Sequence, residues 1–298
     1  MSPAARIDAE VLQRRVQALP ALPRAALDAL EALRDDGLDL SQCAETLARD
    51  PALAAGVLRL ANSPFYGVPG RVARVHDAVL LLGRRMVSTL ATAALAMAQF
   101  APPRVPAFGF EAFWRHAIAV ALAARALARE LRQDEDVAFT AGLLHDIGRL
   151  ALATLYPQPL AQALAWAAAR DVPDGVAEHE LLGVDHAALG RLITTHWRLP
   201  ATVAQAIGGH HGPFDALAGP TPALVVHMAD AMAHALDLES DARERVPELA
   251  PPAAAWVAMQ GSQLLPLLRE VETGVQALGA ALGLRARTAP TASPAALS

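Results

Sequence analysis

Alanine and leucine supply most of the apolar residues of this chain, and they recur at helical spacing, as at Leu27, Leu30 and Leu33. Both are strong helix formers, whereas the alternating Val, Ile and Thr that is typical of strands is scarce. Apolar residues make up 54% of the 298 residues, and aromatic residues only 4%. A chain of this length can bury a sizeable core. The pattern therefore predicts an all-α protein built of several packed helices.

Proline and glycine divide this helical pattern. The clearest break is the segment APPRVPAFG, residues 101–109, which holds three prolines and one glycine. We therefore predict a boundary there between two helical subdomains. A C-terminal helical extension follows them, and then a tail rich in Ala, Pro, Ser and Thr that we predict to be disordered. The four predicted parts are an N-terminal helical subdomain at 8–105, a second helical subdomain at 106–240, the extension at 241–284 and the tail at 285–298.

The spacing of apolar residues, prolines and glycines predicts the helix boundaries in three segments. Residues 134–155 are predicted to form one continuous helix. Residues 74–83 and 85–100 are predicted to form a pair of helices. Residues 252–283 are predicted to form two helices that are broken near Gly261.

Charge and cysteine content narrow the class of protein. The net charge of −5 does not attract nucleic acid or an anionic membrane surface. The single cysteine, Cys43, excludes an internal disulfide and suits a reducing compartment. The uncharged stretches 86–103 and 151–169 contain polar residues or prolines, so we predict buried helices and no membrane span. We expect a cytoplasmic protein that has no nucleic-acid partner.

The segment AGLLHDIGRL, residues 141–150, places a histidine and an aspartate side by side in an apolar run. Charged residues are rarely buried unless they are paired or bind a metal. Other histidines and an aspartate lie on separate predicted helices, and helix bundles build metal sites from facing helices. Imidazole nitrogen and carboxylate oxygen suit Fe, Mn, Ni or Zn. The candidate metal ligands are His116, His145, Asp146, His186, His210, His211 and Asp230.

A structural interpretation of these residues remains open, because none of the pairs has the spacing of an HExxH chelate. In that interpretation His116 hydrogen-bonds within its own helix packing, and the His145–Asp146 pair sets a helix crossing. His210 and His211 cap a helix end, where a cation is favourable. Glu178 is predicted to lie at a solvated helix start.

His116, His145–Asp146 and Asp230 resemble the H…HD…D signature of the HD superfamily of metal-dependent phosphohydrolases. More narrowly, the chain resembles the HDOD family, the HD-related output domains of bacterial signalling proteins. This resemblance implies an all-helical fold, in which an N-terminal helical subdomain packs on an HD-like helical bundle. The matching stretches run in order between residues 19 and 213 and are LPALP, DPALAAGVLRLANSPFYG, HDAVLLLG, FWRHAIAVA, AGLLHDIGRL, EHELLGVDHAALGRLI, WRLP and HHGP.

The resemblance implies signal transduction without an established reaction for the family as a whole. We therefore predict a regulatory protein that binds signalling proteins or a nucleotide second messenger and is not catalytic, with no assigned catalytic or cofactor-binding residue. The alternative is a cyclic-dinucleotide phosphodiesterase of the related HD-GYP type, in which two metals activate water and Asp146 bridges them. Two departures weigh against it. Arg149 replaces the lysine of HDIGK, and Gly212, Pro213 and Phe214 stand where that family has an acidic residue and a Gly-Tyr-Pro loop.

The segment LANSPFYG supports a further alternative. Asn62 is predicted to end a helix in the left-handed conformation, which is a structural role. Phe65 and Tyr66 instead suggest an interface, because aromatic side chains often anchor partner proteins.

Overall fold

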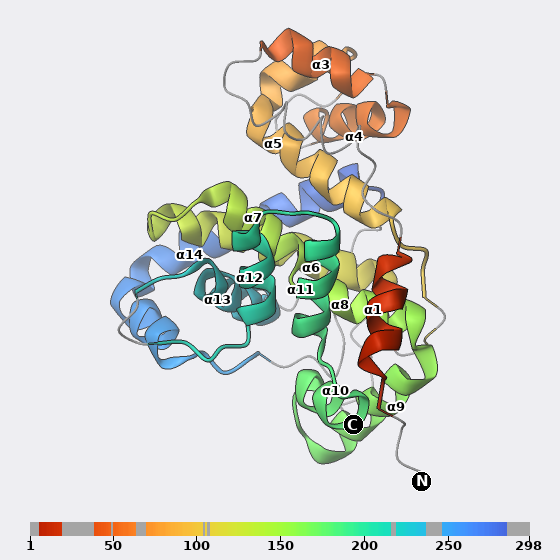
Figure 1. Cartoon of the computed structure of the whole chain (residues 1–298). Helices are drawn as coiled ribbons and strands as arrows, with labels where there is room; N and C mark the ends of the chain where they lie inside the picture. The colour runs from red at the N-terminus through yellow and green to blue at the C-terminus, as the bar shows by residue number, and fades with distance from the viewer. Residues whose placement is uncertain are drawn as a thin grey trace, which may run out of the picture.

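In the computed structural model, the described residues are 6–19, 39–48, 50–63, 70–103, 105, 108–215, 219–236 and 246–284. Every regular element in these ranges is an α-helix (Figure 1), so the all-α prediction is confirmed. The helices are α1 (Ala9–Gln17), α3 (Leu40–Ala48), α4 (Pro51–Ala61), α5 (Val75–Ala98), α6 (Phe110–Glu130), α7 (Glu135–Leu144), α8 (Ile147–Leu155), α9 (Pro157–Arg170), α10 (Asp174–Leu182), α11 (His186–His196), α12 (Ala201–Gly209), α13 (Pro222–Ala235) and α14 (Pro251–Ala281).

Helices α3, α4 and α5 pack on one another and form the group at the top of Figure 1. Gly83 interrupts α5 with φ 74° and ψ 160°, so the predicted pair of helices on either side of it is confirmed. A side chain at this φ would be strained, which explains a glycine inside a helical pattern. Among the described helices, α5 alone has the length and hydropathy of a membrane span, and 56% of its most apolar window is buried.

Asn62 does not take the left-handed conformation that we predicted. In the described ranges the non-glycine residues with positive φ are Arg132, Asp171 and Arg198. The Asn62 amide instead donates to the carbonyl oxygens of Leu58 (2.9 Å) and Val72 (2.7 Å), and its Oδ1 accepts from the Val72 amide. Asn62 therefore ties the end of α4 to the chain before α5. Phe65, Tyr66 and the predicted tail at 285–298 lie outside the described residues.

Helices α6 to α13 pack on one another and form the second group of helices. Helix α6 contacts α7 and α13 of this group and also α14. Its buried face is rich in alanine, which allows neighbouring helices to approach closely. The approach of α7 is so close that a Cβ at Gly142 would lie 2.9 Å from the Val120 carbonyl oxygen. His116 lies on the buried face of α6, and the packing of α7 and α13 brings their residues toward it.

The predicted continuous helix over 134–155 is wrong, because the chain breaks at His145 and Asp146. Helix α7 ends at Leu144 and α8 begins at Ile147, with Asp146 at φ −99° and ψ 12°. Two glycines flank the break, Gly142 against α6 and Gly148 against the start of α11. These two close contacts, which involve segments distant in sequence, hold the chain on either side of the junction between α7 and α8. The His-Asp pair therefore lies at a helix junction and not on one helix face.

We expect Gly148→Ala to destabilise the protein by at least about 3 kcal/mol. The added Cβ would lie 2.0 Å from the His186 carbonyl oxygen and 2.9 Å from the Gly190 amide nitrogen, and both are backbone atoms that cannot rotate away. Urea unfolding measures the change. Gly279→Ala on α14 is the control, since its Cβ meets nothing nearer than 3.9 Å and alanine favours a helix. Equal stability of the two variants would contradict the contact at Gly148.

Helix α14 is continuous from Pro251 to Ala281, so the predicted break near Gly261 is wrong. It packs against α6 and α13 and also against α4. At its end, the Arg59 guanidinium donates through Nε and Nη2 to the Ala281 carbonyl oxygen at 2.9 and 2.6 Å. Helix α14 therefore connects the two groups of helices.

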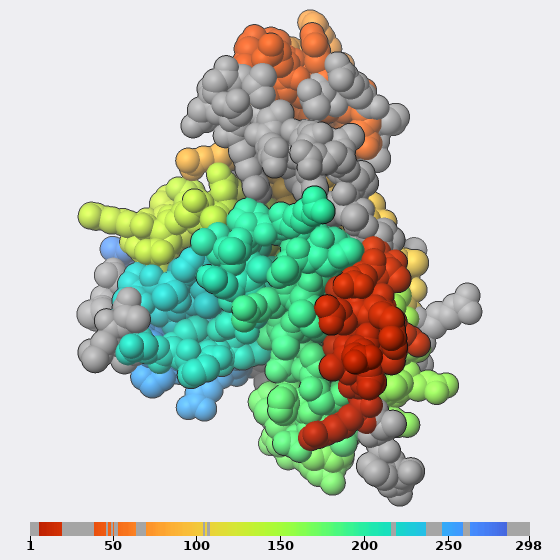
Figure 2. All heavy atoms as spheres, in the orientation of Figure 1, coloured from red at the N-terminus to blue at the C-terminus, as the bar shows by residue number. Residues whose placement is uncertain are grey.

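Helix α1 lies across the face of the second group of helices, where it contacts α11 (Figure 2). The Ile7 amide donates to the Leu182 carbonyl oxygen at 2.8 Å, and Arg15 Nη1 donates to the Leu155 carbonyl oxygen at 2.7 Å. The beginning of the chain is thus held against α8, α10 and α11, which surround one side of the candidate site.

Candidate metal centre

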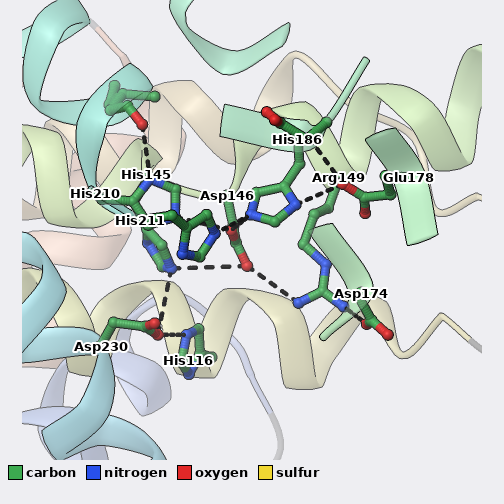
Figure 3. Close-up of polar contacts among 12 residues, drawn as sticks. His116, His145, Asp146, Arg149, Asp174, Glu178, His186, His210, His211 and Asp230 are labelled. Carbon is green, nitrogen blue, oxygen red and sulfur yellow. Dashed lines mark hydrogen bonds and ion pairs between the residues drawn. The ribbon is translucent and has the colours of Figure 1, made fainter. Parts of the chain in front are cut away.

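All seven residues that the sequence singled out lie together in the second group of helices (Figure 3). They come from α6, the junction of α7 and α8, the first turn of α11, the end of α12, and α13. Six are buried, and His211 is exposed at one edge. Their nitrogen and oxygen atoms form three overlapping groups, and within each group the candidate ligand atoms lie within 4.8 Å of one another. The helix packing therefore brings together donors from five separate parts of the chain.

One half of the cluster consists of His116, His145 and Asp230. Asp230 Oδ1 lies 3.0 Å from His116 Nε2 and 3.7 Å from His145 Nε2. His234, one turn further along α13, lies 3.3 Å from the same oxygen through its Nε2. The sequence analysis did not single out His234 as a site residue. We call His116, His145 and Asp230 the first half-site.

The other half consists of His186, His210 and His211. His186 Nε2 lies 2.7 Å from His211 Nε2, and the two atoms share one hydrogen bond. Asp146 Oδ1 lies 3.2 Å from His186 Nε2 and 3.8 Å from His210 Nε2, whereas its Oδ2 lies 3.7 Å from His145 Nε2. The Asp146 carboxylate therefore lies between this second half-site and the first one.

His145 and His210 have a buried ring nitrogen that makes no hydrogen bond. Each Nδ1 donates at 2.7 Å to a backbone carbonyl oxygen, of Gly142 or of Ile207. A carbonyl can only accept, so in the neutral ring the lone pair lies on Nε2. Both Nε2 atoms are buried without a hydrogen-bond partner, although buried polar atoms are nearly always paired. A ring fixed through Nδ1 with an open Nε2 is the arrangement that metal-ligating histidines adopt.

The electrostatics of the cluster favour neutral His145 and His210 and ionised Asp146 and Asp230. Burial and the neighbouring histidines lower the pKa of His210 to about 3, and burial likewise lowers the pKa of His145. His210 ends α12 and its Nδ1 donates to the Ile207 carbonyl oxygen of the last turn, so the predicted helix cap is present at His210, but the lowered pKa makes that cap neutral and not cationic. Burial raises the pKa of Asp146, but nearby histidines and Arg149 outweigh it and hold that pKa well below its usual range. The pKa of Asp230 is held low by the hydrogen bonds from His116 and His234, against its burial.

Glu178 is a member of the site that the sequence analysis missed. It is fully buried on α10, and its Oε2 accepts from the His186 backbone amide at 2.8 Å and from His186 Nδ1 at 2.6 Å. The prediction of a solvated helix start is therefore wrong. Burial lowers the pKa of His186, but the carboxylates of Glu178 and Asp146 raise it to about 9. A carboxylate that orients a histidine in this way is common behind metal ligands.

His227, in contrast, belongs to the scaffold. Its Nδ1 donates to the His210 carbonyl oxygen at 3.1 Å, and its Nε2 accepts from the Ala250 amide at 3.0 Å. Both ring nitrogens are thus occupied, and the ring links α12, α13 and the start of α14. Beside it, a pocket of about 340 Å³ lined by His211, Phe214 and Glu248 reaches the exposed edge of the second half-site.

The comparisons with known proteins agree with the motifs. The family model of the HDOD domain matches residues 19–213. An uncharacterised protein of Treponema pallidum is 27% identical over 199 residues, which are 66% of this chain and 38% of that relative. The chain therefore spans well under half the length of this curated relative.

Two solved structures share the fold over most of the chain. A protein from Shewanella amazonensis titled "Putative phosphohydrolase" has a TM-score of 0.69 and 28% identity, with 91% of this chain and 97% of that chain covered. A protein from Marinobacter aquaeolei titled "Putative signal transduction protein" has a TM-score of 0.73 and 24% identity, with 92% of this chain and 64% of that chain covered. With a family model that matches about two thirds of its length and the ordered motifs around His116, His145–Asp146 and His210–His211, the chain belongs to the HDOD family.

Proposed function

We propose that this HDOD protein is a metal-dependent regulatory protein whose two half-sites hold one or two divalent transition-metal ions. The observation that carries the proposal is the pair of open, buried Nε2 atoms on His145 and His210. A purely structural histidine would be expected to use both ring nitrogens, as His227 does. The mixed nitrogen and oxygen donors suit Fe, Mn, Ni or Zn.

The half-sites divide the ligands between them. His116, His145 and Asp230 would hold one ion, and His186, His210 and His211 the other, while Asp146 contributes to both. His186 would then offer its Nε2 lone pair to the ion, while its Nδ1–H donates a hydrogen bond to Glu178 Oε2. A bound divalent ion supplies Lewis acidity and attracts a phosphate oxygen.

The signal that fits such a centre is a phosphate-containing nucleotide. The pocket beside His211 leads from the surface to the second half-site, and it is lined by Phe214, which offers an apolar ring to a base. We infer that the metal-loaded centre binds the nucleotide, and that the bound nucleotide changes how the protein contacts signalling proteins. Binding without turnover fits the neighbourhood of Arg149, whose guanidinium is already engaged by two carboxylates.

Hydrolysis of a phosphodiester is the second candidate. The position of Asp146 between the two half-sites favours it, because paired metals that share a carboxylate stabilise in-line displacement at phosphorus. Incubation of the metal-loaded protein with cyclic and linear dinucleotides separates the two candidates. Binding with intact nucleotide supports the regulatory role, and release of product that the His145→Ala variant cannot form supports the hydrolase.

Metal content tests the proposal directly. We expect elemental analysis of the purified protein, reconstituted with Fe²⁺, Mn²⁺, Ni²⁺ or Zn²⁺ and then desalted, to give about one to two ions per chain. His145→Ala and His210→Ala should lower this value, because each removes an open Nε2 ligand. His179→Ala is the matched control, since His179 is exposed on α10. A wild-type chain that retains none of the four metals would overturn the proposal.

A further inference from the structure

Arg149 lies beside the two half-sites, on the first turn of α8. Its Nη1 donates to Asp146 Oδ2 at 3.3 Å, and its Nη2 pairs with Asp174 Oδ2 on the first turn of α10. Figure 3 shows the guanidinium between these two carboxylates. The Arg149 side chain is 29% exposed, so one part of it faces the centre and another faces solvent.

The carboxylates around Arg149 differ in how firmly they are held. Asp146 and Glu178 are buried and hydrogen-bond or pair with histidines. Asp174 is 36% exposed, lies at the beginning of α10, and has Arg149 as its one ion-pair partner in the described part of the chain. Asp174 is therefore the partner of Arg149 that can be displaced at the smallest cost, because water can solvate its freed carboxylate.

We propose that Arg149 and the metal-loaded centre form a phosphate-binding subsite, and that Asp174 is the counter-ion that an incoming phosphate must displace. A guanidinium recognises phosphate by paired hydrogen bonds, as it recognises a carboxylate, so phosphate oxygens can replace Asp174 on Arg149. This inference rests on the proposed metal centre and adds a residue that sets its affinity for phosphate. Asp174 acts through Arg149 and does not itself touch the ligand.

The same arrangement makes phosphate binding depend on metal. Without metal, the carboxylates of Asp146, Asp174 and Glu178 outnumber the single guanidinium of Arg149, so the subsite repels anions. Divalent ions in the two half-sites reverse the sign of the local field. The loaded protein should therefore bind phosphate, and the chelator-treated protein should not.

Calorimetric titration of the metal-loaded full chain with inorganic phosphate tests the inference. We expect D174N to bind phosphate about fivefold more tightly than the wild type, because a partly exposed competing ion pair is removed. R149M should weaken binding by about tenfold or more. E180Q is the matched control, since Glu180 is an exposed carboxylate on the same helix as Asp174. Its affinity should match that of the wild type within about twofold.

The double variant R149M/D174N shows whether Asp174 acts through Arg149. We expect it to bind phosphate as weakly as R149M alone, because without the guanidinium there is no pair to release. If D174N strengthens binding equally in the R149M background, or no more than E180Q does, the inference is overturned. Metal content is measured on each sample. A chain that holds no metal overturns the proposed function and this inference with it, whereas a loaded chain without the Asp174 effect overturns this inference alone.

Discussion

Asp146→Asn is expected to remove metal from both half-sites, whereas Asp230→Asn is expected to remove it from the first half-site only. Asp146 faces His145 through one oxygen and His186 and His210 through the other, while Asp230 contacts His116, His145 and His234. Asparagine keeps the shape of aspartate but loses the charge that attracts a divalent ion. Elemental analysis of a two-ion wild type should therefore fall to near zero for Asp146→Asn and to roughly half for Asp230→Asn.

Asp77→Asn is the control for this pair of variants. Asp77 lies on α5, and its side chain is 49% exposed. Its substitution removes one negative charge, as in the other two variants, but on a helix outside the group that contains the half-sites. Its metal content should equal that of the wild type. Circular dichroism of each variant measures its helix content and so distinguishes a loss of metal ligands from a loss of the fold. If Asp146→Asn and Asp230→Asn lose equal amounts of metal, the half-sites do not share Asp146 as the structure indicates.

Glu178→Ala is expected to lower the free energy of unfolding of the metal-free protein by about 3–5 kcal/mol. Glu178 is fully buried and accepts two hydrogen bonds from His186, and its carboxylate helps to raise the pKa of that histidine to about 9. Its removal leaves the backbone amide and Nδ1 of the buried His186 without the acceptor that they share. Urea unfolding in the presence of a chelator measures the loss.

Two further variants serve as controls for the loss of stability in Glu178→Ala. Glu180→Ala removes an exposed carboxylate from the same helix and should change the free energy of unfolding by less than about 0.5 kcal/mol. Glu178→Gln keeps one oxygen that can accept from His186, so its loss should lie between those of the two alanine variants. A Glu178→Ala protein as stable as Glu180→Ala would show that the Glu178–His186 pair does not stabilise α10 against α11.

The sequence was sufficient for the fold class, the family and the identity of the candidate ligands. Alanine and leucine at helical spacing can bury their surface only as packed helices, and α6 and α13 follow that pattern closely. The types of residue that bind metals are few, so an apolar His-Asp pair such as His145–Asp146 stands out without a structure. Histidine and aspartate in an ordered set of motifs therefore indicated the family and the candidate site.

The three-dimensional arrangement was decided by contacts between residues that are distant in sequence. His116 and Asp230 are 114 residues apart, and only the packing of α13 on α6 brings them within 3.0 Å. The break at His145–Asp146 likewise depends on Gly142 meeting Val120 and on Gly148 meeting the start of α11, and local helix propensity predicts no such break.

The charge state of the centre also depended on the tertiary structure. Glu178 reads as a surface residue in the sequence, yet the turn between α10 and α11 buries it against His186. The open Nε2 atom of His210 depends on the Ile207 carbonyl that engages its Nδ1. Burial and partner geometry set the pKa and the tautomer of such side chains, and both are properties of the folded chain that a pattern of residues does not carry.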